Sequence, residues 1–79
     1  MDISLSPLSD LTPGAQVRVS RILGGHQLQR RLLGLGIRVG SRVQVLHRRG
    51  RGVVVAAGGT RVALGGGIAE RLLVQPADA

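Results

Sequence analysis

The chain has 79 residues and a net charge of +7, which comes from 11 arginines, no lysine and four acidic residues. Its length fits one domain, because a single core needs roughly 50 residues and most domains have about 100–150. The absence of cysteine excludes disulfides and thiolate zinc sites, and no apolar run approaches the ~20 residues that span a membrane.

The apolar residues are aliphatic: 12 Leu, 10 Val and 4 Ile, with no Phe, Tyr or Trp. Burial of such side chains contributes about 1.5–3 kcal/mol each, which can suffice for a small core. A valine-rich composition favours strands, because β-branched side chains pack well on a pleated surface. We therefore expect a mostly β domain.

The beginning of the chain predicts a turn followed by a strand. Residues 1–13 hold two prolines and several turn-forming side chains, which indicate a short 3₁₀ turn carrying Leu8 and Leu11. This segment lacks the basic start and apolar stretch of a secretory signal, so we expect a cytoplasmic protein. Residues 16–23 then alternate apolar and polar side chains, as strands do.

A helical spacing replaces this alternation over residues 27–35. Leu28, Leu32 and Leu35 follow one another at i, i+4 and i+7 and would form one apolar stripe. The glycines at 34 and 36 predict the end of the helix, since glycine readily adopts the left-handed conformation that closes one. Two helical turns are unstable in isolation, so packing must hold this helix in place.

The second half of the chain returns to strands. Alternation resumes at residue 42, and residues 48–52 read RRGRG, which predicts a basic, glycine-bearing loop. Residues 68–71 predict one helical turn, residues 72–74 a closing strand, and residues 76–79 a tail.

Between these segments lies a predicted hairpin. Residues 53–57 and 60–64 are mostly apolar runs separated by a pair of glycines, which supply the positive φ that a type I′ turn requires. This turn would pair Ala57 with Thr60 and Val55 with Val62. About five short strands with one helix after the first favour a small barrel. We expect residues 1–79 to form a single domain with its core at about residues 8–75.

The stretch 31–40 reads RLLGLGIRVG and resembles the signature R-L-x-x-L-G-[LI]-x-x-G of the FeoA family, ferrous iron transport protein A. Three further segments resemble the family in the expected order. Residues 11–14 are similar to its L-x-P-G opening, residues 42–45 to its second strand, and residues 68–74 to its closing A-x-x-I-x-V segment. Two segments depart from the pattern, namely the triple glycine at 65–67 and the loop at 48–52, which lacks a proline.

This resemblance implies an SH3-like barrel with a helical turn before the last strand. It also implies a small cytosolic accessory protein of bacterial ferrous iron uptake and iron homeostasis. Its partner would be the membrane transporter FeoB, whose cytosolic part is a GTPase, and binding would modulate the transporter. The partner would then recruit the chain to the inner face of the cell membrane, without direct membrane insertion. We expect a monomer or a weak homodimer.

Arginines are the first candidates for contact with a partner. The guanidinium group carries five donors in a rigid fork that suits carboxylates and phosphates. The alternative is a solvated charged surface that contributes little to stability. The candidate arginines are Arg30, Arg31, Arg48, Arg49 and Arg51.

Aliphatic residues near the predicted helix are the second candidates. Leu33 lies off the stripe of the helix, and Ile37 and Val39 follow it closely. If exposed, such a cluster would dock a peptide or helix. The alternative is that these residues cap the end of the barrel.

His26 and His47 are the only imidazoles and the only weak candidates for a metal. With Asp10 or Glu70 they would make a loose divalent site, whereas isolated histidines facing solvent are the alternative. We expect no tight ferrous site and no cofactor.

Catalysis has little support in the sequence. It contains no evident Ser–His–acid grouping, no paired carboxylates and no phosphate-binding G-x-x-x-x-G-K-[ST] motif.

Two other functions compete with partner binding. An arginine-rich SH3-like barrel can bind nucleic acid, but none is expected here because aromatic side chains that stack on bases are absent; contact with the phosphates of a duplex stays open as an alternative. The third reading is a stand-alone relative of the SH3-like domain of iron-dependent repressors.

Overall fold

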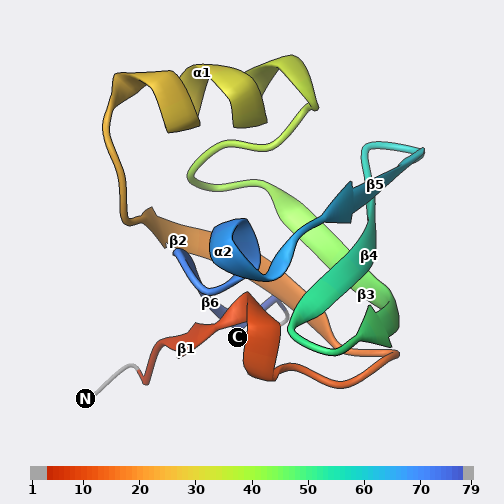
Figure 1. The fold of residues 1–79 in the computed structure, drawn as a ribbon. Helices are drawn as coiled ribbons and strands as arrows, with labels where there is room; N and C mark the ends of the chain where they lie inside the picture. Colours follow the sequence, from red (N-terminus) through yellow and green to blue (C-terminus); the bar gives the residue numbers. More distant parts are fainter. Residues whose placement is uncertain (1–3, 78–79) are drawn as a thin grey trace.

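The computed structural model describes residues 4–77, which form one antiparallel sheet of six strands and three short helical segments (Figure 1). The elements are, in chain order, β1 (Ser6–Pro7), the 3₁₀ helix η1 (Leu8–Asp10), β2 (Gln16–Ile22), α1 (His26–Gly34), β3 (Arg42–Arg49), β4 (Gly52–Ala57), β5 (Thr60–Leu64), α2 (Gly66–Ala69) and β6 (Leu72–Pro76). The strand order in the sheet is β1-β6-β2-β3-β4-β5. No helix among residues 4–77 is long and apolar enough to cross a membrane.

The β4–β5 hairpin has the predicted register. Ala57 pairs with Thr60 and Val55 with Val62, and both glycines of the turn have positive φ angles, +57° at Gly58 and +83° at Gly59. The two-residue turn therefore determines which side chains of these strands face the core, because a shift of one residue would turn each side chain to the opposite face.

The core lies inside the curved sheet and consists of aliphatic side chains. Alternate residues of each long strand point inward, as the period of two requires. The largest fully buried side chains are Leu8, Val19, Leu32, Ile37, Val45, Val55, Leu72 and Val74. Both the 3₁₀ helix and α1 contribute to this core, through Leu8 and Leu32.

A Schellman motif ends α1. The amide N–H of Ile37 donates to the carbonyl of Leu32 at 2.8 Å, and that of Gly36 donates to Leu33 at 2.9 Å. Gly36 has φ +85°, the left-handed conformation that this motif needs. The motif turns the chain back on the helix, and its characteristic apolar pair, Leu32 and Ile37, is completely buried.

Three features of the local structure differ from the prediction. The strand β1 was missed. Arg48 and Arg49 belong to β3, and Gly50-Arg51 forms a tight turn, so residues 48–52 are not an open loop. The helical turn α2 begins at Gly66 rather than at residue 68.

The end of the described chain is also more ordered than predicted. The strand β6 continues to Pro76, and Ala77 is buried. The amide of Ala77 donates to the Gln16 carbonyl at 3.1 Å, and its carbonyl accepts from Arg42 Nη2 at 3.0 Å. The predicted core of about 8–75 therefore extends by two residues at each end in this structure, whereas residues 78–79 of the predicted tail lie outside the described residues.

Candidate partner-binding surface

An open groove of about 410 Å³ lies between α1 and the segment that follows it. We call it the helix groove. It is lined by Ile22, His26, Gln29, Arg30, Leu33, Arg38 and Val39. The Schellman motif builds this groove, because it folds residues 37–39 back so that Arg38 and Val39 come to lie beside the outer surface of α1.

Two aliphatic side chains of the groove face solvent. Leu33 is 59% exposed and Val39 is 56% exposed. Leu33 follows the buried Leu32 by one residue, about 100° around the helix, and therefore points away from the core. The exposed cluster predicted from the sequence thus contains Leu33 and Val39. Ile37 does not belong to it, because its side chain is completely buried.

Leu35 also differs from its prediction. It was placed on the buried stripe of the helix, but it is 45% exposed. The helix ends at Gly34, and Leu35 is the C-cap residue with ψ near 1°, so it no longer follows the helical period. The buried stripe of α1 consists of Leu32 with the partly buried Leu28.

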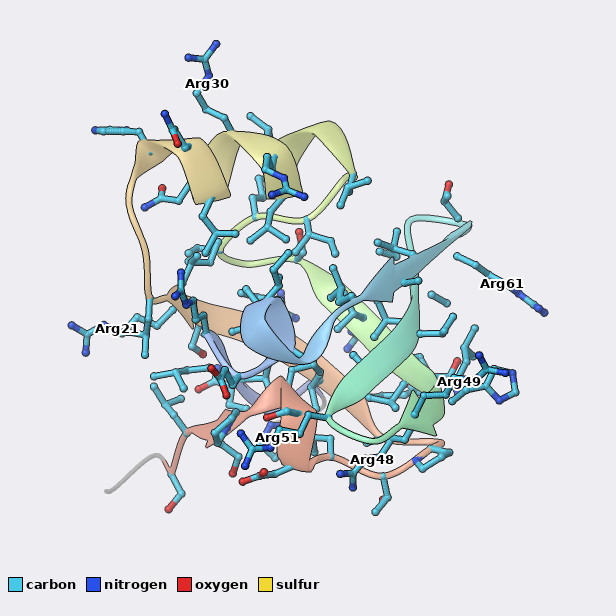
Figure 2. All side chains as sticks on the ribbon, viewed as in Figure 1. Arg21, Arg30, Arg48, Arg49, Arg51 and Arg61 are labelled. Carbon is cyan, nitrogen blue, oxygen red and sulfur yellow. The ribbon has the colours of Figure 1, made fainter. Side chains whose placement is uncertain are left out.

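The charges that line the helix groove are positive. Arg30 and Arg38 contribute guanidinium groups, and no acidic residue of the described range 4–77 lines the groove. Arg30 points away from the barrel into solvent (Figure 2). Within residues 4–77 the one ion pair joins Arg51 to Glu70, at 3.6 Å on an exposed part of the surface.

The predicted arginines do not form one patch. Arg30 and Arg31 lie on α1, whereas Arg48, Arg49 and Arg51 surround the tight β3–β4 turn at the far end of the barrel (Figure 2). Arg48 and Arg49 line a separate hollow of about 540 Å³ together with His47. Arg31 lines another hollow together with Arg71, so among the predicted arginines only Arg30 lies in a groove with exposed leucine and valine within residues 4–77.

The two histidines also lie apart. His26 begins α1 and lines the helix groove, while His47 lies on β3 beside Arg48 and Arg49. No three His, Cys, Asp or Glu side chains come together as a metal-binding group among residues 4–77. Both imidazoles are exposed and have arginines rather than carboxylates around them.

Arg30 and Leu33 were predicted as partner-binding residues and line the helix groove, whereas their neighbour Arg38 was not predicted. The signal was present in the glycine at 36 followed by isoleucine, the pattern of a Schellman motif with its apolar contact. That pattern would have placed Ile37 in the core and Arg38 beside the helix.

The sequence profile of the FeoA domain matches residues 6–76 of the chain. The chain belongs to the FeoA family. A Fe(2+) transport protein A homologue from Methanocaldococcus jannaschii is 31% identical over 72 residues, which cover 91% of this chain and 88% of the relative. The crystal structure of an iron uptake regulatory protein, FeoA, superimposes with a TM-score of 0.82 at 36% identity, over 92% of this chain and 97% of that one.

A manganese-dependent transcriptional repressor shares the same fold. It superimposes with a TM-score of 0.86 at 28% identity over 96% of this chain, which corresponds to 44% of the repressor chain. The similarity therefore concerns one part of a longer regulator. One alternative drawn from the sequence was a relation to the SH3-like domain of iron-dependent repressors, and this repressor is manganese-dependent.

These similarities confirm the mostly β, SH3-like fold predicted from the sequence. The chain is a ferrous iron transport protein of the FeoA family, and proteins of this family are non-enzymatic accessory proteins. The prediction that the chain is not an enzyme agrees with this assignment.

Proposed function

We propose that this chain is a cytoplasmic accessory protein of ferrous iron uptake that binds the cytosolic part of the FeoB transporter and modulates its activity. Membership of the FeoA family and the names of its relatives support a role in ferrous iron transport. The helix groove supports binding of a protein partner through α1 and the segment after it.

One observation carries this proposal: two aliphatic side chains, both more than half exposed, lie in a groove whose charged residues are all basic. Burial of Leu33 and Val39 by a partner would remove apolar surface from water, which favours association. Arg30 and Arg38 would bind carboxylates of the partner and select an acidic surface. We therefore expect an apolar partner segment with acidic flanks.

The arginines at the β3–β4 turn have a different part in the proposal. Arg48, Arg49 and Arg51 lie away from the helix groove, and no exposed aliphatic cluster lies beside them in the described part of the chain. Exposed charges at the edge of an interface mainly raise the association rate and contribute little to affinity. We expect these three residues to speed encounter with an acidic partner.

Binding of the purified chain to the cytosolic GTPase domain of the transporter from the same organism tests the proposal. Leu33→Asp should weaken binding by about tenfold or more, because it places a charge in the apolar part of the interface. Leu5→Asp is the matched control, since Leu5 is 38% exposed and does not line the groove. Replacement of Arg48, Arg49 and Arg51 by Ala should change the dissociation constant by less than about threefold.

The modulation is tested by the GTP hydrolysis rate of the same domain, or by iron uptake into vesicles that hold the full transporter. Wild-type chain should change the rate, and Leu33→Asp should not. Absence of binding by the wild type, or equal loss of binding for Leu33→Asp and Leu5→Asp, would contradict the proposal.

A further inference from the structure

The strand β5 (Thr60–Leu64) lies at one end of the sheet order and is hydrogen-bonded to β4 on one side. Its other edge has no strand partner within residues 4–77. An unpaired edge presents backbone donors and acceptors that can pair with a further strand.

The register shows which groups point to this edge. In a two-residue hairpin the residues that flank the turn, Ala57 and Thr60, exchange both backbone hydrogen bonds. The pattern alternates along the strand, so Val62 and Leu64 also bond to β4. The N–H and C=O groups of Arg61 and Ala63 therefore point away from β4.

A groove of about 450 Å³ runs along this edge. One wall is formed by residues 60–63 of β5, and the other by Gly34, Leu35 and Gly36 at the end of α1. The two glycines have no side chain to fill the groove, and a Cβ atom built at either one would have no neighbour within 4 Å. Leu35, which is 45% exposed, supplies an apolar wall.

Charge decides what kind of strand fits this edge. Arg61 is exposed and points outward from the β5 edge of the barrel (Figure 2). A second copy of this chain would place its own Arg61 at the edge. Each copy also carries a net charge of +7, so pairing of two copies is disfavoured. A carboxylate beside Arg61 would instead form a cross-strand ion pair.

We propose that the free edge of β5 binds an extended peptide in which acidic and apolar residues alternate, so that the peptide adds a strand to the sheet. Side chains of an added strand point alternately to its two faces. The acidic residues lie on the outer face beside Arg61, and the apolar ones face Leu35. Backbone hydrogen bonds to Arg61 and Ala63 hold the peptide in register. This site shares no residue with the helix groove and does not depend on the proposed function.

The experiment uses the full chain and a capped peptide of about eight residues that alternates Glu and Val, at about 150 mM salt. Two peptides serve as controls, one alternating Lys and Val and one with its Glu and Val residues in separate blocks. Binding is followed by NMR, and amide hydrogen exchange is measured at Arg61 and Ala63. We expect the Glu–Val peptide alone to slow exchange at these two amides by about tenfold or more.

Ala63→Pro removes one outward N–H without removing a hydrogen bond of the β4–β5 pair, and proline is tolerated on edge strands whose N–H faces solvent. This variant should bind the Glu–Val peptide roughly tenfold more weakly, whereas Ala63→Ser, which keeps the N–H, should bind as the wild type does. Arg61→Glu should reverse the preference in favour of the Lys–Val peptide.

Three results would overturn the proposal: no binding of the Glu–Val peptide, equal binding of the block peptide, or unchanged hydrogen exchange at Arg61 and Ala63 when the peptide is bound. The exchange measurement on the wild type decides the question even where Ala63→Pro unfolds the chain. Loss of transporter binding in Leu33→Asp with intact peptide binding would separate this site from the helix groove.

Discussion

Leu32 and Leu33 are neighbours in the sequence but have opposite environments. Leu32 is completely buried and Leu33 is 59% exposed. The reason is local: the helical rotation turns Leu33 outward, and the Schellman motif brings Ile37 back against Leu32. Leu32 and Ile37 therefore stabilise the fold, whereas Leu33 lies on the surface that a partner can reach.

Truncation of these side chains should therefore have very different effects on stability. Leu32→Ala and Ile37→Ala should each lower the free energy of unfolding by about 2–5 kcal/mol, because each leaves a cavity in the core. Leu33→Ala should change it by less than about 0.5 kcal/mol, since the side chain is mostly in water. Urea unfolding followed by circular dichroism measures all three. A decrease in the free energy of unfolding for Leu33→Ala as large as that for Ile37→Ala would contradict the exposed position of Leu33.

The glycines at 34 and 36 form a second contrast at the residue scale. Gly36→Ala should lower the free energy of unfolding by about 1–2 kcal/mol, because φ +85° is strained for any residue with a Cβ. Gly34 is the last residue of α1 and has room for a Cβ, so Gly34→Ala should raise it by about 0.4–1 kcal/mol. Thermal unfolding of the two variants, which differ by two positions in the chain, tests this opposite sign.

The sequence predicted part of this picture. Glycine chemistry and helical spacing were enough to find α1, its end and the outward position of Leu33. They failed for Leu35, because the helical period was continued one residue past Gly34, and they did not separate the buried Ile37 from its exposed neighbours. Arg38 was missed because its place beside α1 follows from the reversal of the chain after the helix and not from periodicity.

At the scale of elements, strands defined by local chemistry were predicted and strands defined by a distant partner were not. The β4–β5 hairpin follows from two glycines between apolar runs, and its register was predicted correctly. The strand β1 has only two residues, one of them Pro7, and its sequence carries no alternation. It exists because Ser6 and Pro7 pair with β6, which lies more than sixty residues further along the chain.

The contacts at Ala77 explain why the last strand is longer than its pattern suggested. Arg42→Ala removes the guanidinium that donates to the Ala77 carbonyl at 3.0 Å in a partly buried place. It should lower the free energy of unfolding by about 1 kcal/mol and speed hydrogen exchange at Ala77. Arg21→Ala is the control, because Arg21 projects into solvent (Figure 2) and should have no effect on exchange at Ala77.

At the scale of the whole molecule the dominant feature is unbalanced positive charge. The net charge is +7, and the only ion pair within residues 4–77 is that between Arg51 and Glu70. Repulsion among like charges destabilises the compact state and is screened by salt. The fold must therefore rely on its aliphatic core and backbone hydrogen bonds.

Salt should stabilise this chain for that reason. Raising NaCl from about 20 mM to about 500 mM should increase the midpoint of urea unfolding, since urea is uncharged and leaves the screening effect visible. Arg48→Gln combined with Arg49→Gln should reduce this salt dependence, because it removes two of the crowded charges. A midpoint that falls with salt would show that favourable ion pairs outweigh the repulsion.

Salt also separates the partner classes. Binding to nucleic acid through phosphates weakens by nearly one decade per contacted phosphate for each decade of salt. The affinity of binding through Leu33 and Val39 should fall by no more than about one decade for a tenfold increase in salt, because apolar contacts are not screened. The slope for the transporter domain, compared with that for duplex DNA, tests whether the basic surface serves a protein partner.

The pairing of β1 with β6 has a consequence for how this fold is used in larger proteins. Ser6 lies opposite Val74, so the described chain enters and leaves the barrel at adjacent points, far from α1 and the tip of the β4–β5 hairpin (Figure 1). A unit with neighbouring ends can be grafted into a host loop, or circularised and reopened elsewhere, without disturbing the host backbone. A barrel with this arrangement could join a longer chain at its ends while α1 and the tip of the β4–β5 hairpin lie away from the junction.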